Sequence, residues 1–230
     1  MQTSKISGIS SMATRQVLAE LAGVYRRQAG IEVAIDSVGG VDAAKRVQSG
    51  EPFDVVVLAA DAMDRLIAGG FVVAGSRTDL VRSAVAVAVC AGSARPDIGS
   101  EDALKRAVLS ARTLGYSTGP SGAALLQVFE RWGIADTVRD RIVQAPPGVP
   151  VGHLVAEGAV ELGFQQYSEM LNQPGIAVLG TLPPGCEIVT VFSGGICATS
   201  SQPEAVRALL DFMHSPAAAD AKRRQGMEPV

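Results

Sequence analysis

KISGISSMATRQVLAELAGVYRRQAGIEVAIDSVGG, residues 5–40, is the stretch that decides the fold. Lys5 to Ile9 is predicted to be a strand. Met12 to Gln28 is predicted to be a helix, because its apolar residues recur at helical spacing until Gly30 ends the pattern. Ile31 to Ile35 is predicted to be a second strand. The order strand, helix, strand is typical of a parallel sheet.

Two turns in this stretch each end a predicted strand and open a predicted helix. The first contains the adjacent serines Ser10 and Ser11, and the second contains Gly39 and Gly40. Such turns offer backbone N–H groups and the positive end of a helix dipole to an anion. Adjacent parallel strands bring both turns to the edge of the sheet where ligands of open α/β folds bind. The sequence therefore predicts a site for a small anion.

The rest of the chain continues the alternation of strands and helices in two blocks. A long predicted strand from Ala84 leads into the second block, which has its own strand-turn-helix glycine turn at residues 117–122. We therefore predict an α/β fold of two doubly wound lobes joined by two crossover segments. Lobe one would comprise residues 1–82 plus 190–230, and lobe two residues 83–189. A double connection forms a hinge, which would place the ligand in the cleft between the lobes.

Composition and local patterns exclude several classes of function. The formal net charge of -3 offers no basic surface for nucleic acid. No apolar stretch reaches the roughly 18 to 20 residues of a membrane span, and the first residues, MQTSKISGIS, lack the apolar core and cleavage site of a secretory signal. The sequence as it stands predicts a cytoplasmic protein; a trimmed mature form would be periplasmic. Nucleotide-binding glycine motifs and metal-ligand spacings are missing from the sequence, so we expect no metal and no other cofactor.

Four stretches together resemble the periplasmic molybdate-binding protein family, a branch of the type II two-lobed solute-binding proteins that serve ABC transporters. The resemblance covers nearly the whole chain and implies a periplasmic-binding-protein fold, a small anionic ligand and an ABC permease as a partner. The stretches are VYRRQAGIEV (24–33), AAKRVQSGEPFDVVVLAAD (43–61), RWGIADTVRDRIVQAPPGVPVGHLVAEGAVELGFQQYSE (131–169) and DFMHSPAAADAKRRQGME (211–228).

In that family, hydroxyls and backbone amides at helix starts hold a tetrahedral oxyanion, together with a tyrosine after a late strand. The resemblance implies ligand contacts at the matching positions of this chain, which are Ser10, Ser11, Gly39, Gly40, Ser121, Gly122, Val151, Gln166 and Tyr167. Two departures stand out. Val38-Gly39-Gly40 lacks the serine hydroxyls of the second helix start, and Gln166 stands where the family has its tyrosine.

These departures favour a planar carboxylate as the ligand, because a guanidinium group matches a carboxylate with two parallel hydrogen bonds. Arg15, one helical turn beyond Ser11, is the candidate guanidinium. One hypothesis is a protein that binds a molybdate-like oxyanion or a small organic carboxylate, for delivery to a transporter or for intracellular sensing. The alternative follows from aconitate isomerases, which resemble the same binding proteins: a cytoplasmic isomerase of a small di- or tricarboxylate. In that enzyme His153 or Tyr167 would move the proton, and Glu169 is a further candidate base.

Each of these residues also has a structural explanation. Ser10 and Ser11 are ordinary helix N-caps, and glycines at 39–40 suit a tight turn that needs a positive φ. Arg15 on a helix surface is commonly solvated. A histidine such as His153 more often bonds a neighbouring loop than moves a proton.

Overall fold

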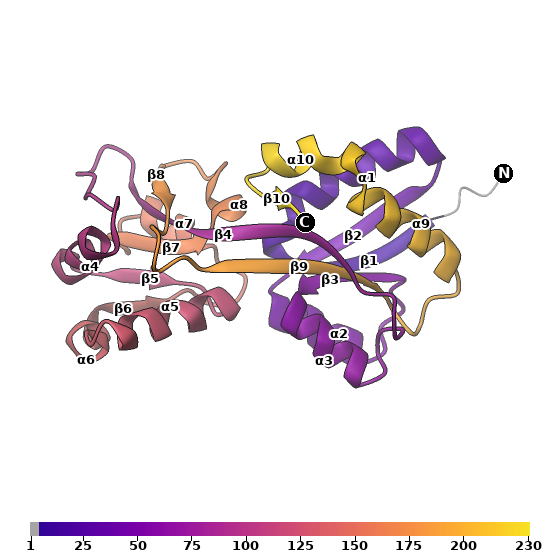
Figure 1. Cartoon of the computed structure of the whole chain (residues 1–230), viewed down its shortest axis with the longest axis horizontal. Coiled ribbons are helices and arrows are strands. Elements are labelled where there is room, and N and C mark those ends of the chain that lie inside the picture. Colours follow the sequence, from indigo (N-terminus) through magenta and orange to yellow (C-terminus); the bar gives the residue numbers. More distant parts are fainter. Residues whose placement is uncertain (1–4) are drawn as a thin grey trace. The chain divides into compact units, whose positions relative to one another are not determined.

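The structure is a computed structural model that describes residues 5–230. The interpretation that the chain lacks a leader depends in part on Met1–Ser4, which lie outside the described residues. The chain divides into two compact units, unit 1 with Met1–Arg82 and Val191–Val230, and unit 2 with Ser83–Thr190. It passes from unit 1 into unit 2 after Arg82 and returns after Thr190 (Figure 1).

Unit 1 is built on a sheet whose first three strands are parallel. The strand order is β2-β1-β3-β9; β1 pairs in parallel with β2 and β3, and β9 is antiparallel to β3. A short strand, β10, pairs with the first part of β4. The strands are β1 (Lys5–Ser11), β2 (Glu32–Val38), β3 (Val55–Ala59), β4 (Thr78–Cys90), β9 (Val189–Ile196) and β10 (Glu228–Pro229).

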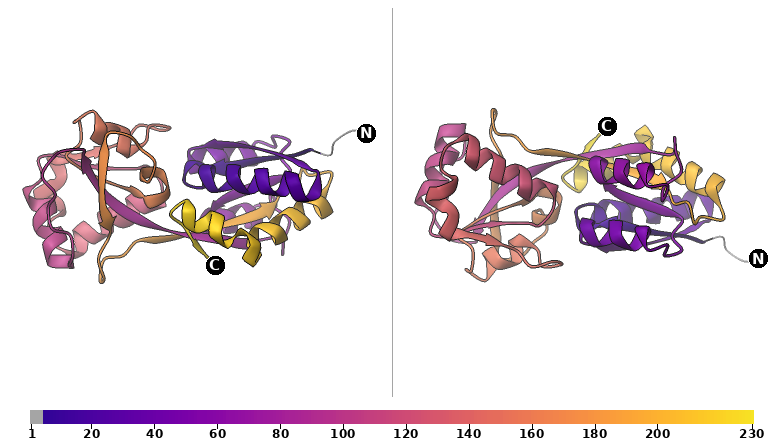
Figure 2. Two further views of the ribbon diagram at one scale, coloured as in Figure 1. Left: turned by 90° about the horizontal axis from the view of Figure 1, so that it is seen from above. Right: turned by 90° about the horizontal axis from the view of Figure 1, so that it is seen from below.

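Helices cover both faces of this sheet because both faces of its strands are apolar. Val55 and Val57 of β3 pack into one hydrophobic cluster, and Val56 and Leu58 pack into another on the opposite face. α1, α9 and α10 cover the first face and α2 and α3 the second (Figure 1), and α1 lies beside α9 and α10 (Figure 2). The helices are α1 (Arg15–Ala29), α2 (Gly40–Gln48), α3 (Ala60–Ala68), α9 (Pro203–His214) and α10 (Ala219–Arg224), with a 3-10 turn, η3 (Pro216–Ala218), before α10.

The first helix begins three residues later than the sequence predicts. A 3-10 turn, η1 (Met12–Thr14), separates β1 from α1, and the Thr14 hydroxyl donates to the Ser11 carbonyl at 3.1 Å. Arg15 is consequently the first residue of α1.

Unit 2 is a second α/β unit with a core of its own. Its strand order is β4-β7-β5-β6, with β5 parallel to both β6 and β7, while β7 and β8 are antiparallel to β4. Phe129 and Phe164 meet edge to face in the core with ring centroids 6.1 Å apart. The elements are α4 (Glu101–Ser110), β5 (Leu114–Tyr116), α5 (Pro120–Arg131), α6 (Ala135–Val138), η2 (Arg139–Arg141), β6 (Ile142–Gln144), α7 (Val151–Ala156), β7 (Leu162–Gln166), α8 (Tyr167–Met170) and β8 (Ile176–Thr181).

The α/β class predicted from the sequence is confirmed, and the strand ends define where functional residues lie in each unit. The carboxyl ends of the parallel strands lead into α1 (through η1), α2 and α3 in unit 1 and into α5, α7 and α8 in unit 2. Within residues 5–230, no helix has both the length and the apolar character that crossing a membrane requires.

Candidate functional site

The candidate residues of unit 1 lie at the carboxyl ends of two paired strands. β1 ends at Ser11 and β2 ends at Val38, and these two residues are partners in the parallel register. Gly39 caps α2, which begins at Gly40. The serine turn and the glycine turn are therefore neighbours at one edge of the sheet.

Ser10 is fully buried, and its hydroxyl is engaged within the protein. Its Oγ lies 2.8 Å from the Ser37 Oγ and donates to the Ser11 carbonyl at 3.2 Å. Local sequence pattern does not distinguish Ser37 as a functional residue. The signal that could have found it is the strand register, which pairs Ser10 with Ser37. This pair joins β1 to β2 behind the first turn.

Ser11 differs from Ser10, because its hydroxyl is unsatisfied. The Ser11 Oγ is buried, and among residues 5–230 it has no hydrogen-bond partner. A buried hydroxyl without a partner costs about 1–3 kcal/mol. A bound anion that accepted a hydrogen bond from Ser11 would remove that cost.

Neither the backbone nor the packing requires the glycines at the start of α2. Gly39 has a φ of -55°, and neither Gly39 nor Gly40 is among the positive-φ glycines, so the turn geometry anticipated above is absent here. A Cβ at Gly40 would lie 3.6 Å from the Ser11 Cβ, an ordinary contact, whereas at Gly8 it would lie 2.6 Å from the Val55 Cγ1. Packing explains Gly8. Gly39 and Gly40 leave backbone uncovered next to Ser11, which suits a ligand that approaches closely.

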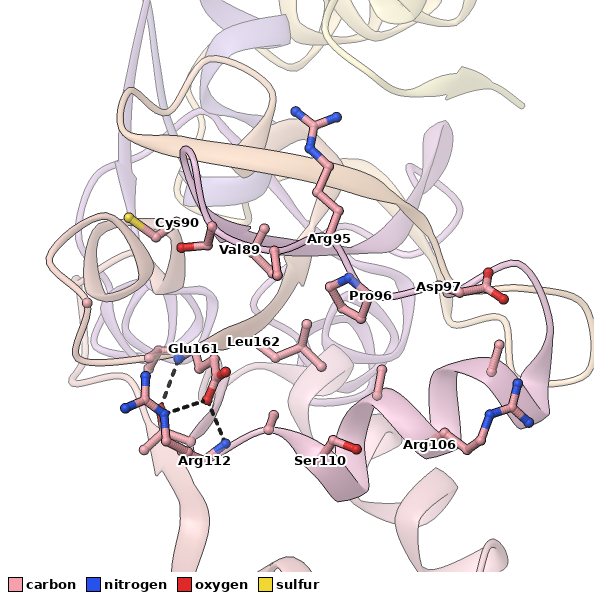
Figure 3. A pocket seen from close by; sticks show the side chains of 18 of the residues that line it. Val89, Cys90, Arg95, Pro96, Asp97, Arg106, Ser110, Arg112, Glu161 and Leu162 are labelled. Carbon is pink, nitrogen blue, oxygen red and sulfur yellow. Dashed lines mark hydrogen bonds and ion pairs between the residues drawn. The ribbon is translucent and has the colours of Figure 1, made fainter.

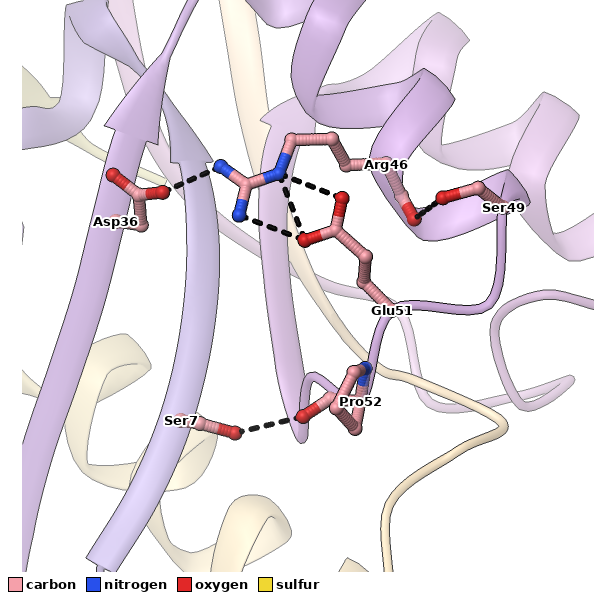
Figure 4. Close-up of polar contacts among 6 residues, drawn as sticks. All are labelled: Ser7, Asp36, Arg46, Ser49, Glu51 and Pro52. Carbon is pink, nitrogen blue, oxygen red and sulfur yellow. Dashed lines mark hydrogen bonds and ion pairs between the residues drawn. The ribbon is translucent and has the colours of Figure 1, made fainter.

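Unit 1 has two arginines near this edge, with different surroundings. Arg46 of α2 is held by carboxylates, since it donates to Asp36 at 2.5 Å and to Glu51 at 2.8 Å (Figure 4). Its hydrogen bonds to Glu51 and Asp36 raise the pKa of Arg46 further. Arg15 is exposed, and no ion pair or hydrogen bond joins its side chain to another of the described residues. Arg15 is thus the guanidinium that remains available to a ligand.

In unit 2, the turn before α5 brings Ser121 and Gly122 against Ser117. The Ser117 and Ser121 hydroxyls are 3.4 Å apart, and the Gly122 amide donates to the Gly119 carbonyl at 3.0 Å. A Cβ at Gly122 would lie 1.9 Å from the Ser117 carbonyl oxygen. The close passage of the turn over α5 therefore accounts for this glycine.

The amides at the start of α7 differ in their hydrogen bonding. The Val151 side chain is fully buried in a small apolar cluster with Val155. The Gly152 amide donates to the Gln165 Oε1 at 3.3 Å, and the His153 amide donates to the Pro150 carbonyl at 3.1 Å. Two amides at this helix start are thus already occupied within the protein, whereas no hydrogen bond from the Val151 amide is found among residues 5–230.

Gln166, the last residue of β7, is buried with one end of its amide unsatisfied. Its Nε2 donates to the Thr190 hydroxyl at 2.8 Å, and its Oε1 has no partner among residues 5–230. Rotating the amide by half a turn lets the Thr190 hydroxyl donate to Oε1 instead, which frees Nε2 as a donor. Tyr167, which follows, is half-buried and begins α8.

The two remaining candidates, His153 and Glu169, have opposite environments. His153 is exposed, and its Nε2 lies 3.2 Å from a carboxylate oxygen of Glu157. Glu169 is half-buried and accepts a hydrogen bond from the Gln165 Nε2 at 2.8 Å. Burial raises the pKa of Glu169 to about 7, although the hydrogen bond from Gln165 acts in the opposite direction. Glu169 therefore exchanges protons near neutral pH.

Unit 2 also contains a cavity of about 610 Å³ that none of these residues line (Figure 3). Thr113 and Glu161, which immediately precede β5 and β7, contribute to its wall, as does Arg112, which pairs with Glu161. The cavity thus lies at the amino ends of the parallel strands. Ligands of open α/β sheets bind at the opposite, carboxyl ends.

A family model for bacterial extracellular solute-binding proteins matches residues 6–228. The chain belongs to this family. An aconitate isomerase from Pseudomonas sp is 36% identical to this solute-binding protein over 228 residues, which are 96% of this chain and 87% of the isomerase. The molybdate-binding protein ModA of Azotobacter vinelandii is 26% identical over 187 residues, which are 79% of this chain and 73% of ModA.

The solved structures support the same fold. The periplasmic molybdate-binding protein of Azotobacter vinelandii superposes with a TM-score of 0.79 at 23% identity, over 96% of this chain and 98% of that one. At this identity the likeness concerns the fold alone. The predicted resemblance of this solute-binding protein to the molybdate-binding and aconitate isomerase group is confirmed.

Proposed function

We propose that this solute-binding protein binds a small organic polycarboxylate. In unit 1 the contacts would come from Ser11, Arg15 and the glycine turn, at the carboxyl edge of the parallel strands. Taken by itself, unit 2 offers Gln166 and Tyr167 at the carboxyl edge of its own sheet. A ligand with several carboxylates suits groups that are spread over several strand ends.

The observation that carries this proposal is the loss of hydroxyl donors for a tetrahedral oxyanion. The Ser10 hydroxyl is hydrogen-bonded within the protein, and the start of α2 has no hydroxyl. Arg15, by contrast, is exposed, and a guanidinium matches a carboxylate with two parallel hydrogen bonds. The aconitate isomerase, whose name refers to a tricarboxylate, also matches this chain at higher identity and over more residues than ModA does.

A thermal-shift panel tests the proposal. A ligand that binds only the folded protein stabilises it by about 2.7 kcal/mol at a hundred times its Kd. We expect cis-aconitate, trans-aconitate or citrate to raise the melting temperature, and molybdate, tungstate, sulfate and phosphate to leave it unchanged. A shift with molybdate or tungstate alone would contradict the proposal.

A second candidate function is the isomerisation of the bound tricarboxylate. It is favoured by the 36% identity to an aconitate isomerase and by a half-buried carboxyl, Glu169, whose pKa lies near 7. Incubation of the protein with cis- or trans-aconitate in D2O, followed by NMR, tests it. New isomer or incorporated deuterium supports catalysis, and an unchanged ligand limits the protein to binding.

The role in the cell depends on which candidate holds. A binding protein would deliver the polycarboxylate to an ABC permease or report its concentration as a sensor. An isomerase needs neither a permease nor a role in sensing. Ligand release without chemical change, measured in the same NMR experiment, separates the two roles.

A further inference from the structure

We infer that Glu169 is the catalytic base that moves the proton during isomerisation of a tricarboxylate. The inference rests on the second candidate function and assigns its chemistry to one side chain. It differs from the sequence-based expectation, which favoured His153 or Tyr167 for that role.

The position of Glu169 follows from the end of β7. Gln165 is the penultimate residue of that strand, and Glu169 lies on α8, which follows the strand directly. Gln165 is 3% exposed, and its amide is fixed at both ends. Its Oε1 accepts from the Gly152 amide at 3.3 Å, and its Nε2 donates to the Glu169 Oε1 at 2.8 Å. The relay from α7 therefore holds the Glu169 carboxyl at the carboxyl edge of the unit 2 strands.

The Glu169 carboxyl has a hydrogen-bond donor but no counter-charge. Among residues 5–230, Gln165 is the hydrogen-bond partner of Glu169, and no cation is paired with it. α8 packs against β7 and β8, and neither strand contains a titratable side chain. The Nε2 of His153, on α7, lies 3.2 Å from a carboxylate oxygen of Glu157. Tyr167 shares α8 with Glu169.

This environment suits a proton carrier. Partial removal of a carboxylate from water is costly when no cation is near it, so the charged and neutral forms of Glu169 are close in free energy near neutral pH. A general base works best when its pKa is near the working pH. With Oε1 occupied by Gln165, Oε2 is left to take up the proton. A base whose orientation is set by a third group is the usual arrangement for proton transfer.

The reaction balances without a co-reactant. Aconitate has a CH2 group next to both its double bond and a carboxylate. The Glu169 carboxylate removes one proton from that CH2, which breaks a C–H bond and spreads the electron pair over the three-carbon unit. The carboxylic acid then returns the proton to the other end of the unit. The double bond shifts, a new C–H bond forms and the carboxylate is regenerated.

His153 and Tyr167 are less suited to this step. His153 is exposed and paired with Glu157, so water surrounds it. Either residue can contact the ligand, but neither side chain is held in place by a buried residue as Glu169 is held by Gln165.

Two substitutions at position 169 distinguish the proposal from a structural role. Glu169→Gln keeps the shape of the side chain and an oxygen that accepts from Gln165, but an amide cannot take up the proton. Glu169→Asp keeps the acid and shortens the side chain. Catalysis by Glu169 predicts more activity in E169D than in E169Q, whereas a purely structural role predicts the reverse order.

The measurement is the rate of conversion of trans-aconitate into its isomer, followed by NMR, together with the Kd from calorimetry; a proton that Glu169 itself returns need not exchange with solvent. General base catalysis contributes about 10²- to 10⁴-fold. We therefore expect E169Q to bind within about threefold of the parent and to isomerise trans-aconitate at least 100-fold more slowly. Glu130→Gln, an exposed residue of α5 in the same unit, is the matched control and should match the parent in both measurements.

The inference is overturned if E169Q isomerises trans-aconitate at a rate within tenfold of the parent, or if it is more active than E169D. It is also overturned if the parent protein binds tricarboxylates without isomerising them, and in that case the proposed binding function stands. A parent protein that binds no polycarboxylate at all would overturn the proposed function itself. If E169Q does not fold, the activities of E169D and of the parent are measured at several pH values instead. A pH profile of E169D that is the same as that of the parent would then overturn the assignment of Glu169 as the base.

Discussion

The substitution Gly40→Ala separates the functional role of the glycine turn from a structural one. An alanine Cβ at this position would lie 3.6 Å from the Ser11 Cβ and 4.0 Å from the Leu58 Cδ2, which are ordinary van der Waals distances. The backbone at Gly40 is not in the positive-φ region. Since alanine is favoured over glycine in a helix by up to about 1 kcal/mol, we expect the free energy of unfolding of the ligand-free protein to stay unchanged or to rise.

Ligand binding should respond in the opposite direction. The added methyl group would occupy the space next to the unsatisfied Ser11 hydroxyl, where we propose that a carboxylate approaches the backbone. Loss of one hydrogen bond to a charged group costs about 1.5–3 kcal/mol, which is roughly a 10- to 100-fold increase in Kd. Urea unfolding of the ligand-free protein and calorimetric titration with trans-aconitate measure the two effects.

Gly23→Ala is the matched control. Gly23 lies within α1, its φ is not positive, and the nearest atom to a new Cβ would be the flexible Arg27 Nη1 at 3.7 Å. We expect the same direction of change in stability as in G40A and no change in Kd. If G40A binds trans-aconitate as tightly as G23A does, the glycine turn is not where the ligand approaches and the reasoning is refuted.

Three further substitutions test other parts of the account. Ser11→Ala removes a buried, unsatisfied hydroxyl, so the ligand-free protein should be as stable as the parent or about 1 kcal/mol more stable, while the Kd for trans-aconitate rises roughly 10- to 100-fold; a less stable, normally binding variant would refute this role. Arg15→Ala should raise the Kd for a tricarboxylate by a factor that corresponds to about 1.5–3 kcal/mol, and an unchanged Kd in calorimetry would exclude Arg15 as a clamp. Burial raises the pKa of Asp54, but hydrogen bonds from Ser7 and Ser200, among others, outweigh it and lower that pKa below its ordinary value. The stabilisation by Asp54 is therefore complete above the unfolded pKa of about 3.9 and is lost as the pH falls through the lower native pKa. In urea titrations, the free energy of unfolding of Asp54→Asn should be well below that of the parent at pH 7, and this difference should become smaller toward pH 3. A difference that persists undiminished at pH 3 would contradict the sign of this linkage.

Local sequence patterns predict the elements because strands and helices have different periods. The apolar spacing after Thr14 identifies α1, and the continuous apolar run Val55–Ala59 identifies a buried parallel strand, β3. The start of α1 was predicted three residues early, because the hydrogen bond from Thr14 to Ser11 that forms the 3-10 turn leaves no periodic signal.

The hydrogen bonding and pKa of each polar group could not be predicted from local sequence pattern. Ser10 and Ser11 are adjacent serines that local sequence pattern does not distinguish. The strand register places Ser37 opposite Ser10 and leaves the Ser11 hydroxyl unsatisfied. The contact between the Gly152 amide and Gln165 joins residues that are 13 positions apart in the chain. The raised pKa of Glu169 likewise depends on burial by the folded unit. Such tertiary effects decide which candidates remain available for a ligand.

The most direct test of the central claim is a calorimetric titration of the ligand-free protein with trans-aconitate and, separately, with molybdate. The account predicts saturable one-to-one binding of trans-aconitate and no detectable heat of binding for molybdate under the same conditions. Saturable binding of molybdate without binding of any polycarboxylate would contradict it.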